Sequence, residues 1–262
     1  MRATNRTEAR TEGRTALVTG GAKRIGKAIV EDLSAHGWSV AIHCNSSRHD
    51  GSNLADTIHA QGGRAAVIVA DLADPTAVSR IMPQANAALG PIDLLVNNAS
   101  IFELDDIASM TPAVWQAHHQ VNLMAPIFLA QAFAAQLPAG KPGNIINMID
   151  QRVLKLSPEF FSYQLSKSAL WVATRTLAQA LSPQIRVNAI SPGPTLQNAR
   201  QQPEDFQAQL DGLLLKKGAT LGEFGSTVRY FTETPSITGQ MICLDGGQHL
   251  AWETPDIAGI VE

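Results

Sequence analysis

The stretch TALVTGGAKRIG, residues 15–26, decides how this chain folds. Thr15–Thr19 is a short apolar run that stops at glycines, as a buried parallel strand does. From Lys23 to His36 the apolar residues recur at helical spacing, and Gly37 follows this segment. A strand, a glycine-rich turn and a helix in this order form the start of a dinucleotide-binding unit.

The glycines of this turn suit a phosphate ligand. Gly20 permits a sharp turn after the strand, and Gly26 lets the helix approach the sheet closely. The free N–H groups at the start of the helix then favour a pyrophosphate at this place. An ordinary glycine-rich turn without a ligand is the alternative, so the motif gains weight only from the rest of the chain.

Strand-like and helix-like segments alternate beyond this unit. Further buried strands are predicted at Ser39–Cys44, Ala65–Ala70, Ile92–Val96, Asn144–Ile149, Ile185–Ile190 and Gln240–Leu244. Helices are predicted near 51–61, 75–89 and 111–136, and over most of Ser157–Ser182. The alternation predicts an α/β fold, a doubly wound, Rossmann-type domain with a mainly parallel seven-stranded sheet flanked by helices. The less regular interval from Pro192 to about Thr220 could carry a substrate lid.

The composition favours one soluble, cytoplasmic domain. The 262 residues are 45% hydrophobic and carry a net charge of −3, so they can bury a sizeable core and offer no basic surface to nucleic acid. No apolar run reaches the roughly 18 residues that a membrane span needs. Cys44 and Cys243 lie far apart, which excludes a disulfide framework and fits a reducing compartment. We expect a single domain over 14–262 after a disordered tail over 1–13, whose acids and missing apolar face argue against a targeting peptide.

The end of the second predicted strand bears on the choice of cofactor. Enzymes that select NAD usually place Asp or Glu here, to hold the ribose hydroxyls. This chain instead has His43, Asn45, Ser46, Ser47 and Arg48. Hydroxyl, amide and guanidinium groups can donate hydrogen bonds to a 2′-phosphate, so the segment favours NADPH over NADH. A polar surface loop without a ligand is the alternative.

A tyrosine and a lysine supply the expected proton chemistry. Tyr163 and Lys167 stand four residues apart within a predicted helix, so both side chains point from one face. A tyrosine with a pKa of ~10 donates protons poorly at neutral pH. A neighbouring ammonium should bring the pKa of Tyr163 toward neutrality and could also hold ribose hydroxyls. Taken alone, the pair also fits an ordinary solvated helix face.

Together these motifs resemble those of the short-chain dehydrogenases/reductases, over residues 15 to about 250. The matching segments, in chain order, are TGGAKRIG, Asp71-Leu72, Asn97-Asn98-Ala99-Ser100, Asn122, Tyr163-x3-Lys167, Ser191-Pro192-Gly193 and Asp245-Gly246-Gly247. The resemblance implies that Asp71 binds the adenine amino group and that Asn97 lies along the cofactor. It also implies that Asn122 holds a water linking Lys167 to solvent, and that the Pro192-Gly193 turn positions the nicotinamide carboxamide. The expected cofactor contacts are Gly20, Arg24, Ile25, Gly26, His43, Asn45, Ser46, Ser47, Asp71, Leu72, Asn97, Ala99, Tyr163, Lys167, Pro192 and Gly193.

Three departures from the usual family pattern agree with one another. Asp150 replaces the catalytic serine 13 residues before the tyrosine, Arg24 replaces the middle glycine of the turn, and Phe102 follows the Asn97 motif. All three resemble the pteridine reductases and the bacterial dihydromonapterin reductases. In those enzymes an aromatic residue at the place of Phe102 stacks the pterin against the nicotinamide. An arginine at the place of Arg24 touches the phosphate and the pterin.

The chemistry of these side chains fits a pterin. A flat, electron-poor ring favours a π-face on one side and the nicotinamide on the other. A carboxylate at Asp150 accepts the amino and ring N–H groups and could relay a proton to a ring nitrogen. The expected substrate contacts are Arg24, Ser100, Phe102, Asp150 and Tyr163. Alternatively, Phe102 is a lid or core aromatic and Asp150 a structural cap.

The sequence therefore predicts an NADPH-dependent reductase that passes hydride to a C=N carbon of a dihydropterin. The expected catalytic residues are Asp150, Tyr163, Lys167 and Asn122. A reductase of carbonyl or alcohol substrates is one alternative, and a non-catalytic NADPH-binding sensor is another. The intact tyrosine, lysine and asparagine set argues against the sensor, which needs no proton relay.

The expected partner is a small molecule, with no nucleic acid, membrane or metal. His118 and His119 have no carboxylate or cysteine at ligand spacing, which argues against a metal site. Arg152 could line the mouth of the pocket or lie in a solvated loop. We expect a homotetramer or a dimer, and in related tetramers a tail such as the one after Trp252 can reach a neighbouring site.

Overall fold

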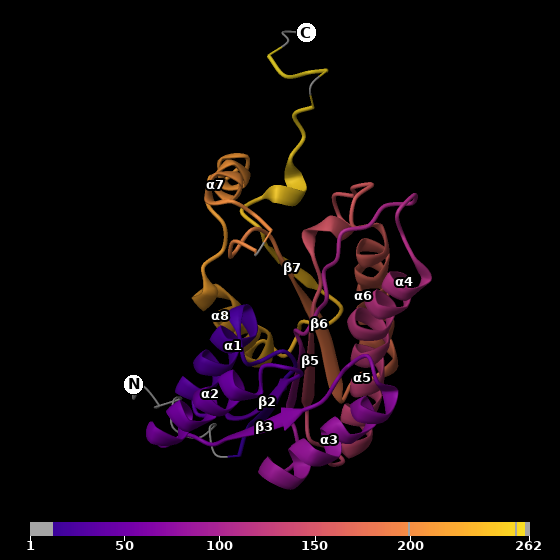
Figure 1. The fold of residues 1–262 in the computed structure, drawn as a ribbon. Coiled ribbons are helices and arrows are strands. Elements are labelled where there is room, and N and C mark those ends of the chain that lie inside the picture. Colours follow the sequence, from indigo (N-terminus) through magenta and orange to yellow (C-terminus); the bar gives the residue numbers. More distant parts are fainter. Residues whose placement is uncertain (1–12, 199, 255, 260–262) are drawn as a thin grey trace.

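Seven strands pair into one sheet in the order β3-β2-β1-β4-β5-β6-β7 (Figure 1). The computed structural model describes residues 13–198, 200–254 and 256–259. The strands are β1 (Thr15–Val18), β2 (Ser39–Cys44), β3 (Ala65–Val69), β4 (Leu94–Asn97), β5 (Gly143–Met148), β6 (Ile185–Pro192) and β7 (Met241–Leu244). Every neighbouring pair runs parallel. The predicted doubly wound α/β fold is confirmed, and its seven strands are wholly rather than mainly parallel.

Helices cover both faces of the sheet (Figure 1). One face carries α1 (Arg24–Ala35), α2 (Arg48–Ala60) and α8 (Leu221–Glu233). The other carries α3 (Pro75–Leu89), α4 (Pro112–His119), α5 (Ala125–Gln136) and α6 (Phe161–Ala180), while α7 (Pro203–Asp211) projects above the sheet. Successive strand residues enter opposite layers: Val18 packs in the core with α1 and α8, and Leu17 in the core with α3 and α5.

The strand order places a crevice at one edge of the sheet. From β1 the chain winds outward to β2 and β3, and it then returns to β4 on the other side of β1. The segments that follow β1 and β4 therefore diverge at the carboxyl ends of these strands. Open α/β sheets bind their ligands at such a reversal.

The single helix predicted over 111–136 is interrupted in the structure. α4 ends at His119, a π-helical turn covers Gln120–Met124, and α5 begins at Ala125. A π-helical turn widens the helical hydrogen-bond pattern and is frequent at functional sites. The spacing of apolar residues did not reveal this interruption.

Other boundaries also differ from the prediction. The helices α7 and α8 were not predicted, although Phe224, Val228 and Phe231 of α8 are fully buried at helical spacing. The helix α6 covers most of Ser157–Ser182, as predicted, and it begins at Phe161 because Phe160 has a φ of +56° and cannot belong to a right-handed helix. The predicted strands differ from the observed ones by at most 2 residues at either end.

Some expectations fall on segments without a structural description. Of the predicted tail at 1–13 only Gly13 is described, and the chain after Trp252, an exposed residue, is described in part.

Within the described ranges no helix is long and apolar enough to cross a membrane. The same ranges hold no group of three or more His, Cys, Asp or Glu that could bind a metal ion. Cys44 and Cys243 are both free thiols.

Candidate active site

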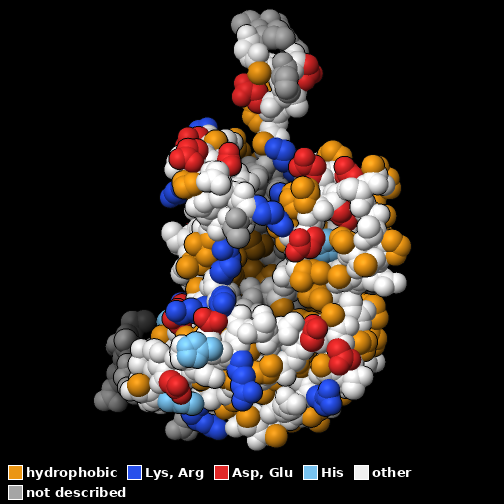
Figure 2. Space-filling view, in the orientation of Figure 1, with side chains coloured by type: hydrophobic (Ala, Val, Ile, Leu, Met, Phe, Trp, Pro, Cys, Tyr) orange, Lys and Arg blue, Asp and Glu red, His pale blue; other side chains and the backbone are white. Residues whose placement is uncertain are grey.

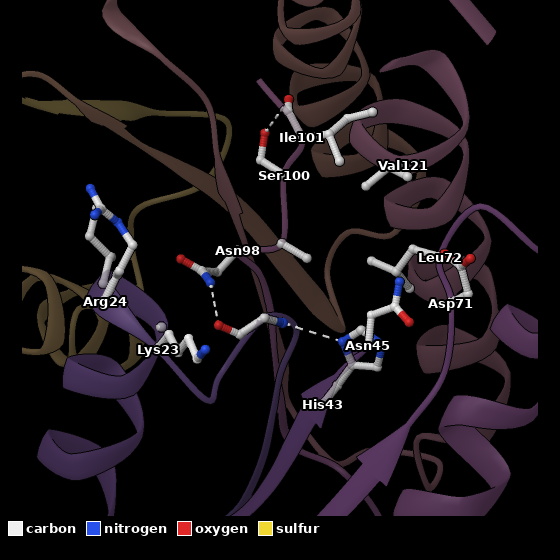
Figure 3. Close-up of a pocket in the computed structure, with 14 residues that line it drawn as sticks. Lys23, Arg24, His43, Asn45, Asp71, Leu72, Asn98, Ser100, Ile101 and Val121 are labelled. Atoms are coloured by element: carbon white, nitrogen blue, oxygen red, sulfur yellow. Dashed lines mark hydrogen bonds between the residues drawn. The ribbon is translucent and has the colours of Figure 1, made fainter. Parts of the chain in front are cut away.

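Two adjoining cavities open at the carboxyl ends of the strands. The first, about 400 Å³, is lined by the turn after β1, the end of β2 and the segments after β3 and β4 (Figure 3). The second, about 490 Å³, is lined by side chains from the segments after β4, β5 and β6. Arg24 and Ile25 line both cavities. Figure 2 shows this face hollowed, with Lys and Arg side chains along the rim.

The turn after β1 has the geometry that its glycines predict. Gly20 has a φ of +62°, in the region that favours glycine. A Cβ on Gly26 would stand 2.2 Å from the Gly20 carbonyl oxygen, so α1 packs against the turn with no room for a side chain. The Asn98 amide donates hydrogen bonds to the carbonyl oxygen of Thr19 at 2.8 Å and to that of Gly20 at 3.1 Å, and Figure 3 shows the second of these bonds. The segment after β4 thus holds the turn in shape.

Arg24 takes the backbone conformation that a glycine would take at this place. Its φ is +53°, so the turn keeps its path despite the larger side chain. The guanidinium crosses the cleft and donates to the carbonyl oxygens of Leu196 and Gln197, both at 3.1 Å. It therefore links the first cavity to the segment after β6.

His43 supports the turn from the end of β2. Its Nδ1 accepts the Gly20 N–H at 3.3 Å (Figure 3). Its Nε2 therefore carries the hydrogen, which faces the Ala70 carbonyl oxygen at 3.1 Å. Burial lowers the pKa of His43 from 6.5 to about 4. The ring is therefore neutral near pH 7 and has a fixed tautomer.

The other expected cofactor residues divide into two groups. Asn45, Asp71, Leu72 and Ala99 line the first cavity, whereas Ser46 and Ser47 do not and lie just before α2. Lys23, which the sequence analysis did not single out, also lines this cavity, and its Nζ stands 3.0 Å from Asp50 Oδ2. The feature of the sequence that could have identified Lys23 is its position within the glycine-rich turn.

Asn97, which the family resemblance expects along the cofactor, is the last residue of β4. Its side chain is buried and donates to Asn147 Oδ1 at 2.8 Å, beneath the crevice. The side chain that lines the first cavity belongs to the next residue, Asn98. The position of Asn97 along the cofactor stays a prediction.

Tyr163 and Asp150 form a directly bonded pair. The Tyr163 hydroxyl donates to Asp150 Oδ2 at 2.8 Å, while Asp150 Oδ1 accepts the Arg152 N–H at 2.8 Å. The Arg152 guanidinium lies 3.5 Å from the same Oδ1. Burial, and then the negative charge of Asp150, raise the pKa of Tyr163 well above 10. The prediction that the pKa of Tyr163 moves toward neutrality is therefore wrong for this structure.

Lys167 points at the backbone of the neighbouring strand. Its Nζ donates to the Met148 carbonyl oxygen at 2.8 Å and lies 5.8 Å from the centre of the Tyr163 ring. Burial lowers the pKa of Lys167 to about 8. The lysine and the tyrosine thus share one side of α6, as predicted, without a direct bond between them.

Asn122 anchors the segment after β4. Its Oδ1 accepts the Ser100 hydroxyl at 3.1 Å and the Ile101 N–H at 3.0 Å. Its Nδ2 donates to the Ile101 carbonyl oxygen at 3.0 Å and to Ser166 Oγ at 3.2 Å. The side-chain amide has then used its usual four hydrogen-bonding positions. The water expected at Asn122 would have to bind its main chain.

Phe102 lies in an aromatic cluster at the second cavity. Its ring stacks on Phe160, with centres 4.2 Å apart, and meets Tyr163 edge-on at 4.7 Å. The guanidinium carbons of Arg152 and Arg200 each lie 5.2 Å from the Phe102 ring centre. Phe160 and Arg200 were missed in the sequence, because both lie in irregular segments without a periodic signal. Pro192 and Gly193, predicted at the cofactor, line this cavity.

Sequence comparison identifies the family of this chain. A family model described as short chain dehydrogenase matches residues 14–208. The chain belongs to the short-chain dehydrogenase/reductase family. This member of the family is an oxidoreductase, and the family predicted from its motifs is confirmed. It is 34% identical to the L-xylulose reductase of Bos taurus over 246 residues, which cover 91% of this chain and 97% of that reductase.

Solved structures of other family members superpose on this short-chain reductase. FolM Alternative dihydrofolate reductase 1 from Brucella canis, complexed with NADP, is 57% identical, with a TM-score of 0.92, over 95% of this chain and 100% of that one. The corresponding Brucella suis protein, also with NADP, is 57% identical with the same TM-score, over 94% and 99%. A short chain dehydrogenase from Burkholderia cenocepacia in complex with NADP is 34% identical over 92% and 100%, with a TM-score of 0.85.

Proposed function

We propose that this enzyme is an NADPH-dependent reductase that converts a dihydropterin to a tetrahydropterin. The observation that carries the proposal is the hydrogen bond between Tyr163 and Asp150 beside the Phe102 ring. A carboxylate in the place of the usual serine suits a substrate that presents N–H groups. The Brucella structures support the proposal, because their names describe dihydrofolate reductases with bound NADP.

The first cavity fits a phosphorylated dinucleotide. The crowded Gly26 brings the start of α1 and its free N–H groups to the cavity. No carboxylate follows β2 directly, and the Lys23 ammonium and the Asn45 amide line the wall instead. A bound NADPH would supply the hydride. We propose that Gly20, Ile25, Asp71 and the other predicted contacts that line this cavity hold the cofactor, with Lys167 on the ribose.

The protein's own task is to orient the substrate and to handle a proton. Reduction of a C=N bond adds a hydride to the carbon and a proton to the nitrogen. Tyr163 holds a proton at Oη, and Asp150 accepts it in a hydrogen bond. We assign proton donation to this coupled pair rather than to either residue alone. The Asp150 side chain is 15% exposed, so the pair can recover its proton from solvent.

The substrate would enter the second cavity. Phe102 offers an aromatic surface there, and Arg24 reaches the boundary between the two cavities. Ser100, which lines the first cavity, lies beside the Asn122 amide. We propose that these residues, with Asp150 and Tyr163, contact the pterin.

Steady-state kinetics test the proposed function. We expect wild-type enzyme to reduce dihydrobiopterin or dihydromonapterin with a kcat/KM far above its value for simple ketones. We also expect NADPH to bind at least about tenfold more tightly than NADH, a difference of about 1.4 kcal/mol. Turnover of ketones without turnover of pterins would assign the enzyme to the carbonyl reductases. Binding of NADPH without any turnover would favour a sensor.

We further propose that the enzyme acts in the cytoplasm as a homotetramer or a dimer. The support for the assembly, and not for the compartment, is a set of exposed apolar side chains on the π-helical turn and the helices α5 and α6, namely Met124, Phe128, Leu165 and Val172. Exposed apolar side chains on neighbouring helices are typical of subunit interfaces. Light scattering on the purified protein would give the mass of the assembly directly, and a monomeric mass would contradict this proposal.

A further inference from the structure

The segment that carries Phe102 is fixed at two points by one helical stretch. We call residues 100–106 the substrate loop. Asn122, in the π-helical turn, binds the Ile101 N–H and carbonyl on one side of Phe102. His118, near the end of α4, accepts the Glu103 N–H at 3.1 Å on the other side. Phe102 is therefore held between two anchors that stand four residues apart in sequence.

The second anchor continues into a buried chain of hydrogen bonds. Because His118 Nε2 accepts the Glu103 N–H, its Nδ1 carries the hydrogen and donates to Ser162 Oγ at 2.6 Å. The Ser162 hydroxyl donates in turn to Asp105 Oδ2. The chain has one consistent direction, from the histidine through the serine to the carboxylate, and it returns to the substrate loop at Asp105.

The same carboxylate holds the start of α6. The Ser162 N–H donates to Asp105 Oδ1 at 3.2 Å, and the Phe161 N–H donates to the Asp105 carbonyl oxygen at 3.2 Å. The residue before the helix, Phe160, supplies no side-chain cap of its own. Asp105 therefore supplies the missing cap from a distant segment, where a negative charge also suits the helix dipole.

These three side chains lie behind the site rather than in it. His118 and Ser162 are 0% exposed and Asp105 is 3% exposed, and none of them lines either cavity. Ser162 directly precedes Tyr163, and the His118 ring meets the Tyr163 ring edge-on at 5.9 Å. The chain of hydrogen bonds thus connects the loop of Phe102 to the start of the helix that carries Tyr163 and follows Phe160.

We propose that His118, Ser162 and Asp105 form a positioning relay that sets the Phe102 ring against Phe160 and Tyr163. The inference rests on the proposed function, since it assumes that these rings receive the substrate. A small displacement of a reacting group can reduce turnover severely. We therefore expect the relay to act on substrate binding and turnover and not on the cofactor cavity.

Four variants distinguish loss of the relay from a general loss of stability. His118→Leu removes both ring contacts, and Ser162→Ala removes the central hydroxyl. His118→Gln keeps an acceptor that can reach the Glu103 N–H but loses the donor to Ser162. The matched control is His119→Gln: this histidine stacks on Trp115 and bonds the Trp115 carbonyl oxygen, outside the relay.

Kinetics on the NADPH-dependent reaction give the first readout. In His118→Leu and Ser162→Ala we expect the KM for the dihydropterin to rise about tenfold, as for loss of a buried hydrogen bond, with the Kd for NADPH within about twofold of wild type. His118→Gln should recover part of this loss, and His119→Gln should match wild type. An unchanged KM in both relay variants would overturn the proposal. An equal rise in the NADPH Kd would do the same, since it would indicate general loss of structure.

Amide hydrogen exchange gives a second readout that needs no substrate. In the NADPH complexes of His118→Leu and Ser162→Ala we expect faster exchange in the substrate loop and unchanged exchange in β4. Unchanged exchange in the loop would overturn the relay, even if one variant were too unstable to assay. Failure of the wild type to reduce any pterin would instead defeat the proposed function, and the exchange result would still decide whether the relay positions this loop.

Discussion

At the scale of single residues, the Tyr163 proton is subject to opposing influences. Burial and the Asp150 carboxylate stabilise the neutral phenol, whereas the nearby Lys167 ammonium is directed at the Met148 carbonyl oxygen. The hydroxyl is therefore kept protonated and already aligned with an acceptor at 2.8 Å. In the proposed reaction, proton transfer from Tyr163 would depend on Asp150 and on the substrate together, because a change at one partner changes the affinity of the other for the proton.

The change Tyr163→Phe tests this role. It removes the hydroxyl and keeps the ring that packs against Phe102. We expect kcat to fall by roughly 10²-fold or more, the usual contribution of a positioned proton donor, with NADPH affinity nearly unchanged. Stopped-flow turnover and a fluorescence titration of NADPH would measure the two effects. A variant that kept most of its kcat would show that another group delivers the proton.

His43 links protonation to stability. Its pKa of about 4 in the folded protein lies below 6.5, so the unfolded chain binds the proton more tightly. The stabilisation is complete above pH 6.5, decreases as the pH falls toward 4, and amounts to about 3 kcal/mol between these limits. Denaturant unfolding at pH 7 and pH 4.5, for wild type and His43→Gln, would measure it. A pH dependence as steep in the variant as in wild type would contradict this assignment.

At the scale of secondary-structure elements, several features fix the backbone shape of the turn between β1 and α1, which lines the first cavity. Gly20 and Arg24 both adopt positive φ values, and Gly26 packs against the Gly20 carbonyl. The turn is braced by His43 from β2 and by Asn98 after β4. The shape of this glycine-rich turn therefore depends on contacts with the ends of β2 and β4.

The change Gly26→Ala tests how closely α1 must approach this turn. The added Cβ would stand 2.2 Å from a backbone oxygen, so the turn or the helix has to move. We expect a loss of about 1–3 kcal/mol in unfolding free energy, together with weaker NADPH binding. Gly222 is the matched control, because a Cβ at that place meets no atom within 4 Å. Equal stability of the Gly26→Ala and Gly222→Ala proteins would contradict the packing described above.

The elements differ in how well the sequence predicts them. Strands and helices with dense apolar patterns were placed to within a few residues, as β2 and α3 illustrate. The sequence did not indicate that Asn98 lines the first cavity while the Asn97 side chain is buried, because strand residues alternate between faces and the motif does not state which face points outward. The π-helical turn, Phe160 and Arg200 depend on tertiary contacts and have no local periodic pattern. The Tyr163 pKa could not be predicted, because it depends on burial and on the distance to Asp150.

At the scale of the whole molecule, two adjoining cavities lie at the carboxyl ends of the strands of the parallel sheet. The segments after β1, β2 and β3 line the first cavity, which we propose for the cofactor, and the segments after β5 and β6 line the second, which we propose for the substrate; the loop after β4 lines both. Arg24 lies between the two, and its guanidinium ties the cofactor turn to the segment after β6. The reaction proposed here needs both cavities filled at once, with the proton pair and the aromatic surface facing the same substrate.

The most direct test is kcat/KM for a dihydropterin, measured with NADPH in wild type, Phe102→Ala and Asp150→Ser. Stacking beyond plain burial contributes roughly 0.5–1.5 kcal/mol, and lost apolar contact adds to it. We therefore expect Phe102→Ala to raise the pterin KM about tenfold or more with little effect on NADPH. Asp150→Ser should lower kcat more than it weakens binding, because in the proposed reaction the carboxylate takes part in proton transfer. Wild-type enzyme that reduces simple ketones and no dihydropterin would contradict the account.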